Sequence, residues 1–123
     1  MEKTPYKGPG NLSRLWNSTL YSWNGLKATF KAEPSFRLEL LAAAILIPLT
    51  FFLPVNGIGR ALMIASILLV LILELLNSAI EAIVDRISLE QHPLSKRAKD
   101  IGSAAVLLGL INVCVVWGCV LFG

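Results

Sequence analysis

The sequence has few charged residues and only two cysteines and one histidine, and this shortage narrows the kind of protein it can be. Of its 123 residues, 15% are charged and 55% are hydrophobic. A soluble domain of this length cannot bury so much apolar surface, so the composition indicates an integral membrane protein. The net charge of +3 comes without a dense basic cluster, and nothing in the composition points to nucleic acid as a partner.

Several familiar motifs are also missing. Cys114 and Cys119 lie in the last apolar stretch and would point to different faces of a helix, so a shared disulfide or metal site is not expected. The first ~35 residues lack the continuous apolar core of a cleavable signal peptide. There is no Gly-x-x-x-x-Gly-Lys-Ser/Thr loop and no protein-kinase signature, so familiar motifs do not predict a nucleotide site.

The apolar pattern predicts an all-α membrane protein with one domain over residues 11–123, following a disordered segment at 1–10. Residues 11–32 carry apolar side chains at helical spacing, with Trp16 and Trp23 on the apolar stripe. That pattern is typical of an amphipathic helix lying in the membrane interface. Transmembrane helices are predicted at about 35–53, 60–84 and 101–122, with a kink at Pro48, a turn at 54–60 and a polar connector at 85–100.

The basic residues predict the orientation of these spans. Of 11 Lys and Arg residues, one lies in the turn between the first two spans, namely Arg60. The others precede or open the first span (Lys3, Lys7, Arg14, Lys27, Lys31, Arg37) or lie in the polar connector (Arg86, Lys96, Arg97, Lys99). The positive-inside rule therefore predicts a cytoplasmic N-terminus and connector and an extracytoplasmic C-terminus.

The second predicted span carries polar side chains on one face, despite its apolar length. At about 100° per residue, the five residues of this polar face fall within about a quarter-circle: Glu74, Asn77, Ser78, Glu81 and Asp85. An unpaired carboxylate in hydrocarbon costs at least about 2.5 kcal/mol. We therefore expect this face to be turned towards protein, water or a bound cation.

The spacing of the acids suggests their chemistry. Glu81 and Asp85 are one helical turn apart near a membrane surface, an arrangement that suits Mg²⁺ already carrying phosphates, with Glu33 as a further ligand. Glu74 lies about two turns deeper, where a carboxyl could act as a general base on a lipid hydroxyl. Arg14, Arg97 and Lys99 could neutralise phosphate charge.

Each of these residues also has a purely structural interpretation. Glu81 and Asp85 could form a solvated helix end, and Asp85 could pair with a basic residue of the connector. Asn77 and Ser78 could join helices by hydrogen bonds, and Glu74 could be a protonated packing residue. His92 could simply face solvent, and Trp117 could be an ordinary interfacial aromatic residue.

Two blocks of the sequence resemble one known family closely. The first runs from Glu74 to Arg86 with the pattern Glu-x-x-Asn-Ser-x-x-Glu-x-x-x-Asp, and the second begins Arg97-Ala98-Lys99-Asp100 and runs to Val106. Together with residues 21–28 and 33–39, these blocks resemble the prokaryotic integral-membrane diacylglycerol kinase family. The likeness covers about 12–39 and 60–118, whereas 1–10 and about 40–58 add little beyond hydrophobicity.

The resemblance implies ATP-dependent phosphorylation of diacylglycerol to phosphatidic acid by a homotrimer in the bacterial inner membrane, with sites shared between protomers. Glu74 would be the base, Asn77 would position the catalytic groups, and Glu33 and Glu81 would hold Mg²⁺. The residues implied to contact ATP are Arg14, Tyr21, Glu33, Glu81, Glu90, His92, Lys99 and Asp100. Those implied to border the lipid are Arg14, Trp23, Phe36, Glu39, Arg60, Glu74, Ser103 and Trp117. The role of Asp85 stays open.

Three other functions remain compatible with the residues themselves. A prenyl alcohol such as undecaprenol could replace diacylglycerol as substrate, because apolar walls do not exclude a long chain. A small oligomeric proton-coupled transporter could use Glu74 as its carrier site, but this would leave Glu33, Glu81 and the basic connector unexplained. A non-catalytic assembly subunit would need no polar face at all.

Overall fold

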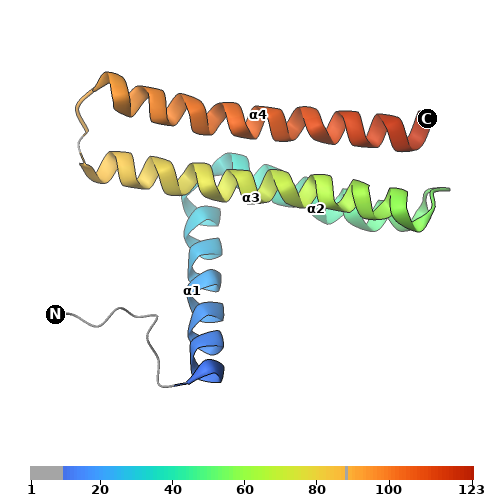
Figure 1. Cartoon of the computed structure of the whole chain (residues 1–123), viewed down its shortest axis with the longest axis horizontal. Coiled ribbons are helices and arrows are strands. Elements are labelled where there is room, and N and C mark those ends of the chain that lie inside the picture. Colours follow the sequence, from blue (N-terminus) through green and yellow to red (C-terminus); the bar gives the residue numbers. More distant parts are fainter. Residues whose placement is uncertain (1–9, 88) are drawn as a thin grey trace. The chain divides into compact units, whose positions relative to one another are not determined.

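The computed structural model describes residues 10–87 and 89–123, and this part of the chain is built from helices. The α-helices are α1 (Asn11–Ala32), α2 (Pro34–Leu49), α3 (Gly57–Ile87) and α4 (Pro93–Phe122), and a short 3-10 helix, η1 (Thr50–Phe52), continues α2 (Figure 1). The prediction of an all-α protein is confirmed. The predicted disorder at 1–10 falls, apart from Gly10, outside the described residues.

Helix α1 forms a unit by itself, separate from the unit that begins at Glu33. Its bounds match the predicted amphipathic helix. The apolar stripe is exposed, with Trp16 at 66% and Trp23 at 59% of their full accessibility, and the ammonium of Lys27 lies 6.0 Å from the centre of the Trp23 ring. Exposed tryptophans with a neighbouring lysine are what an interfacial helix presents to lipid headgroups.

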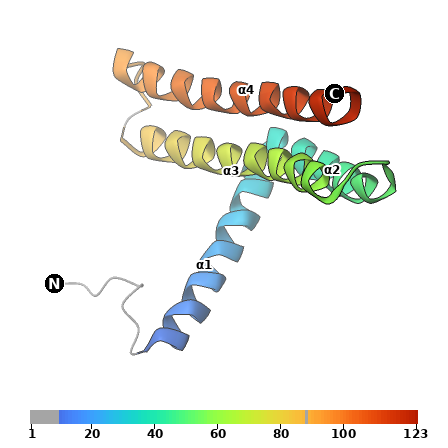
Figure 2. The ribbon, with the colours of Figure 1, turned by 45° about the vertical axis from the view of Figure 1, so that its right-hand side comes forward.

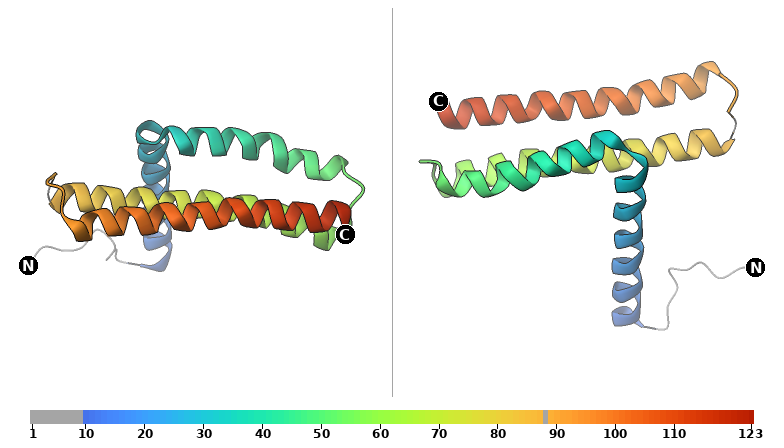
Figure 3. Two further views of the ribbon diagram at one scale, coloured as in Figure 1. Left: turned by 90° about the horizontal axis from the view of Figure 1, so that it is seen from above. Right: turned by 180° about the vertical axis from the view of Figure 1, so that it is seen from behind.

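The second unit contains three helices long and apolar enough to cross a membrane: Pro34–Phe52, Gly57–Ile87 and Pro93–Phe122. Helix α3 packs against both α2 and α4 (Figures 1 and 2). Figure 3 shows α4 running alongside α3. Helix α2 is shorter and is connected to the start of α3 by a turn. Among the described residues of this unit, helix α3 therefore has a helix on each of two sides.

Helices α3 and α4 extend beyond the predicted membrane spans and into the predicted polar connector at 85–100. Helix α3 runs to Ile87, and α4 begins at Pro93, so only residues 88–92 separate them. His92 has extended backbone and its ring nitrogen Nδ1 accepts from the Leu94 amide at 3.1 Å, while proline suits the first helical position. Charged residues end a hydrophobic run, but they do not end a helix that has good caps.

The turn between α2 and α3 is also shorter than predicted, because Asn56 caps α3 within it. The Asn56 side-chain oxygen accepts from the Gly59 amide at 2.7 Å, so helix formation begins at Gly57. Pro48 lies inside α2 without ending it, and the chain tightens into η1 at Thr50. Proline removes one helical hydrogen bond, and a tightened last turn supplies other partners for the freed carbonyls.

Arg60 holds this turn together. Its Nε donates to the carbonyl oxygen of Thr50 at 2.9 Å, and Nη2 donates to that of Val55 at 3.2 Å. Its guanidinium carbon also lies 5.3 Å from the centre of the Phe51 ring. One side chain thus binds a carbonyl of η1 and a carbonyl of the turn that leads into α3.

Candidate active site

The polar face of α3 is turned towards protein, as the sequence predicted. Glu74 is only 5% exposed, and Asn77, Ser78 and Glu81 are half-buried. The face receives side chains from α2 on one side and contacts α4 on the other: Ser78 Oγ donates to Glu33 Oε1 at 3.3 Å, and Asn77 packs against Gly102. Ser78 therefore links α3 to Glu33, the residue that immediately precedes α2.

Glu33 and Glu81 come together at this face. Their carboxylates are close enough to interact, although one lies just before α2 and the other in the last third of α3. Asn77 Nδ2 donates to Glu81 Oε1 at 3.4 Å, a long hydrogen bond. Two carboxylates side by side in a partly apolar setting repel each other, and a cation shared between them removes that repulsion.

A second pair of carboxyl groups lies deeper between α2 and α3. Glu39 interacts with Glu74, and Glu39 Oε2 is buried without a hydrogen-bond partner. A buried carboxyl oxygen without a donor is costly unless a proton or a ligand satisfies it. Glu39 and Glu74 thus form an inner acidic pair, and Glu33 and Glu81 an outer one on the same face of α3.

Beyond the outer pair, the ends of α3 and α4 are joined by a lysine. Lys99 Nζ lies 2.7 Å from Asp85 Oδ1, with side chains 42% and 51% exposed, and Lys99 also interacts with Glu81. This is the pairing with a basic residue that the sequence allowed for Asp85. Lys96 pairs with Asp100 one turn apart on α4, at 2.6 Å.

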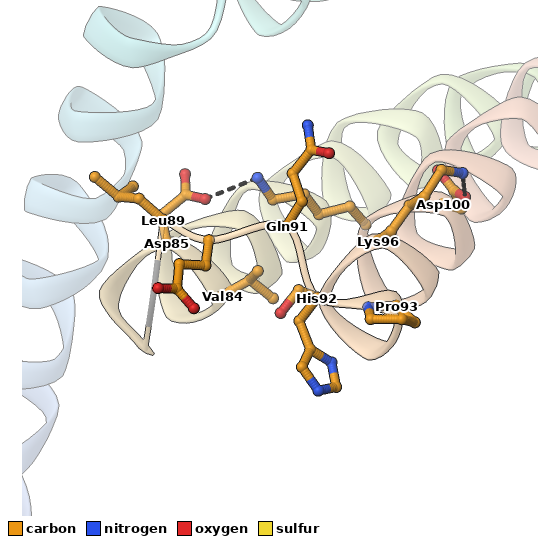
Figure 4. Close-up of a pocket in the computed structure, with 11 residues that line it drawn as sticks. Val84, Asp85, Leu89, Gln91, His92, Pro93, Lys96 and Asp100 are labelled. Carbon is orange, nitrogen blue, oxygen red and sulfur yellow. Dashed lines mark hydrogen bonds and ion pairs between the residues drawn. The ribbon is translucent and has the colours of Figure 1, made fainter.

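A cavity of about 530 Å³ lies where the chain passes from the end of α3 into the start of α4 (Figure 4). Its polar lining comes from the end of α3, the connecting residues and the first turns of α4: Asp85, Glu90, Gln91, His92, Ser95, Lys96, Lys99 and Asp100. Four of these are predicted nucleotide contacts: Glu90, His92, Lys99 and Asp100. The charged lining consists of three carboxylates and two lysines, and each lysine is paired with an aspartate, so the cavity offers groups of both charges to a small polar ligand.

The oxygen donors of the outer pair fit a magnesium ion that brings phosphates with it. Within residues 10–87 and 89–123, no group of three or more His, Cys, Asp or Glu side chains is arranged to hold a metal. Mg²⁺ in nucleotide sites is commonly held by one or two carboxylates, with phosphate oxygens and waters completing its shell. Glu33 and Glu81 supply that number of carboxylates.

Two residues predicted to border the lipid, Arg60 and Trp117, lie away from the two acidic pairs. Arg60 and Glu74 are fourteen residues apart on α3, about 21 Å along its axis, and Arg60 binds the α2–α3 turn. Trp117 lies towards the same end, with its indole N–H donating to the Met63 carbonyl at 3.3 Å. The structure therefore does not bring these two residues to the carboxylates.

The remaining predicted lipid contacts are distributed over three helices. Phe36 is 2% exposed and lies on α2 between Glu33 and Glu39, whereas Ser103 is exposed on α4. Arg14, Tyr21 and Trp23 belong to α1, the separate unit, so their contacts with nucleotide or lipid stay predictions.

The residue that sequence reasoning missed is Gly102. It is buried against Asn77, and a second buried glycine, Gly109, follows seven residues later on the same face of α4. The available signal was this spacing, since glycines repeated on one face of a membrane helix indicate close helix packing. What the spacing could not tell is which residue of α3 each glycine meets.

Known proteins resemble this chain over nearly its whole length. The family described as prokaryotic diacylglycerol kinase matches residues 20–121, including the stretch from 40 to 58. The diacylglycerol kinase of Haemophilus influenzae is 58% identical over 117 residues, covering 95% of this chain and 98% of that protein. The diacylglycerol kinase of Pseudomonas aeruginosa is 53% identical over 123 residues, covering 100% of both, and that of Escherichia coli K12 is 48% identical over 109 residues, covering 89% and 88%.

Proposed function

The chain belongs to the prokaryotic diacylglycerol kinase family, and we propose that the polar face of α3 is where it phosphorylates diacylglycerol with ATP to give phosphatidic acid. The observation that supports this placement is the convergence of two acidic pairs on that face, beside a cavity lined by Lys99. Phosphoryl transfer depends chiefly on positioning and charge neutralisation, and this arrangement provides groups for both.

Glu74 acts as the general base in this proposal. The primary hydroxyl oxygen of diacylglycerol attacks the γ-phosphorus of ATP, the bond from that phosphorus to the β–γ bridging oxygen breaks, and ADP leaves. The hydroxyl proton passes to a carboxylate oxygen of Glu74. Burial of Glu74 between helices keeps bulk water away from this oxygen, which limits competing hydrolysis of ATP.

The outer pair and its neighbours bind the polyphosphate end of the nucleotide. Bound Mg²⁺ would neutralise phosphate charge, and Glu33 and Glu81 are the residues that would hold it. Ser78 orients Glu33 and Asn77 orients Glu81 through their hydrogen bonds. Lys99, which already interacts with Glu81, supplies a positive charge for the phosphates.

The cavity between the end of α3 and the start of α4 binds the adenosine part of ATP. Its lining adds Glu90, His92 and Asp100 to Lys99. His92 caps α4 through its Nδ1, so its position is fixed by the helix start rather than by a ligand. The predicted contacts of Arg14 and Tyr21 on α1 are part of the same proposal.

The membrane arrangement follows from charge distribution and family membership. Ten of the 11 Lys and Arg residues lie in the N-terminal 37 residues or between 86 and 99, and by the positive-inside rule this supports a cytoplasmic location for these regions and the cavity. The prokaryotic family supports the bacterial inner membrane as that membrane. Cytoplasmic ATP would then meet a lipid hydroxyl at headgroup depth. As a member of this family the chain is proposed to work as a homotrimer, with sites shared between protomers.

The test is transfer of radiolabelled γ-phosphate to dioleoylglycerol in mixed micelles by purified protein. The wild type forms labelled phosphatidic acid, whereas E74Q loses about 10²–10⁴-fold in kcat, the range for removal of a general base. As a control, S66A removes another buried polar group of α3, two turns away, and retains activity. Near-normal turnover by E74Q would rule out the base, and labelling of undecaprenol in place of dioleoylglycerol would change the substrate.

E81Q tests the outer pair separately. Loss of one carboxylate charge is expected to weaken MgATP binding most at low Mg²⁺, because fewer oxygens then compete with water for the ion. The measurement is the KM for ATP across a magnesium titration. An unchanged KM at every magnesium concentration would exclude Glu81 as a ligand.

A further inference from the structure

Gly102 lies at the point where α4 comes closest to the polar face of α3. A methyl group built on Gly102 would overlap Asn77 Oδ1 and come within 3.2 Å of its Cγ. Glycine is the least favourable helix residue after proline, and Gly102 lies well inside the thirty-residue α4. Its absence of a side chain is what leaves room for the Asn77 amide.

The Asn77 amide is held in one orientation by this contact and by Glu81. Its Oδ1 is buried against Gly102 and has no hydrogen-bond partner, while its Nδ2 donates to Glu81 Oε1. The two atoms belong to one rigid amide plane. If an added methyl group displaces the oxygen, the plane must turn, and the donor moves away from the carboxylate.

We propose that Gly102 is a positioning residue for the kinase reaction, which keeps the Asn77 amide directed at Glu81 and so sets the orientation of the Glu81 carboxylate. The inference rests on the proposed role of Glu81 in binding MgATP. Gly102 itself touches neither nucleotide nor lipid in this account. It acts through Asn77 alone.

Gly109 provides a matched control. It is buried on the same face of α4, and a methyl group there would lie 2.8 Å from Leu73 Cδ1 and 3.6 Å from Val70 Cγ2. Both glycines therefore meet the far end of a side chain, which can rotate without separating the helices. G102A and G109A make the same chemical change in the same interface, and only G102A displaces a polar group.

The experiment measures binding of the magnesium complex of AMP-PNP, a non-hydrolysable ATP analogue, together with kinase activity. G102A is expected to weaken analogue binding about tenfold, the size of effect expected for losing a hydrogen bond to a charged group. G109A is expected to stay within about twofold of wild type. In an N77A background, G102A should add nothing further, because the amide it displaces is gone.

Each outcome decides the inference. Wild-type binding by G102A, an equal loss in G109A, or an undiminished G102A effect in the N77A background would overturn it. If G102A alone fails to fold, recovery of the folded protein in G102A/N77A supports the overlap, and failure of both overturns it. Wild-type analogue binding by E81Q and N77A would instead remove the proposed nucleotide site, and the role of Gly102 with it.

Discussion

Replacing Arg60 with alanine separates a structural role from a role in lipid binding. The guanidinium donates to the Thr50 and Val55 carbonyls and stacks on Phe51. A hydrogen bond from a charged group contributes about 1.5–3 kcal/mol, and a cation–π contact at an exposed ring about 0.5–1 kcal/mol. Because Arg60 is half-exposed, we expect R60A to lower the free energy of unfolding by about 2–4 kcal/mol.

Reversible unfolding in mixed micelles by titration with sodium dodecyl sulfate measures this change. R60K keeps the charge but presents a single point donor, so it should recover about half of the loss. F51L removes only the stacking and should cost less than about 1 kcal/mol. At a temperature well below unfolding, the KM of R60A for diacylglycerol should match that of wild type.

The opposite pattern would refute the reasoning. If R60A unfolds like wild type and its KM for diacylglycerol rises several-fold, Arg60 borders the lipid, as the family resemblance implied, and its hydrogen bonds to the turn add little. A loss of both stability and lipid affinity would show that the turn and the lipid site are coupled over about 21 Å.

Three further predictions test the neighbours of the site. S78A removes the hydrogen bond to Glu33 and should raise the KM for MgATP about two- to tenfold, with little change in the KM for lipid, as steady-state kinetics would show. D85N breaks the ion pair with Lys99, whose two side chains are about half exposed. It should therefore change the free energy of unfolding by less than about 1 kcal/mol, and a larger change would mean that the pair is shielded from water. W117F loses its indole hydrogen bond and should destabilise by about 1 kcal/mol in the same unfolding assay at unchanged kcat, whereas a large fall in kcat would return Trp117 to the lipid site.

The helices could be predicted from the sequence because hydrophobic periodicity and length are strong local signals. The bounds of α1 match the prediction, and the polar face of α3 turns towards protein, as the cost of exposed carboxylates in lipid required. Helix ends were harder. Hydropathy falls at Asp85 and recovers after Asp100. Helical hydrogen bonding nevertheless continues in α3 to Ile87 and starts again in α4 at Pro93, because His92 and Pro93 begin α4 before the apolar run.

The partners of the polar face could not be predicted, because spacing along one helix does not identify the facing residue on another. The sequence allowed Ser78 to join helices, but only the packing of α2 on α3 selects Glu33 as its acceptor. Gly102 was invisible for the same reason, since its importance depends on meeting Asn77. The position of Arg60, in contrast, could have been predicted from one helix alone, because the helical rise separates Arg60 from Glu74 by about 21 Å.

The position of the acids follows from how much of each span is covered by protein. In the most apolar window of α3, 28% of the residues are buried, compared with 17% for α2 and 6% for α4. A carboxylate is tolerated at membrane depth only where neighbouring helices shield it from lipid, and α3 has a helix on each side. Accordingly the acids of α3 and Glu39 of α2 meet at a shared interface, whereas residues 101–122 of α4 carry no charge. The interface between the central helix and α2 can thus hold ionisable groups within a membrane span, as a kinase requires when its substrate stays in the membrane.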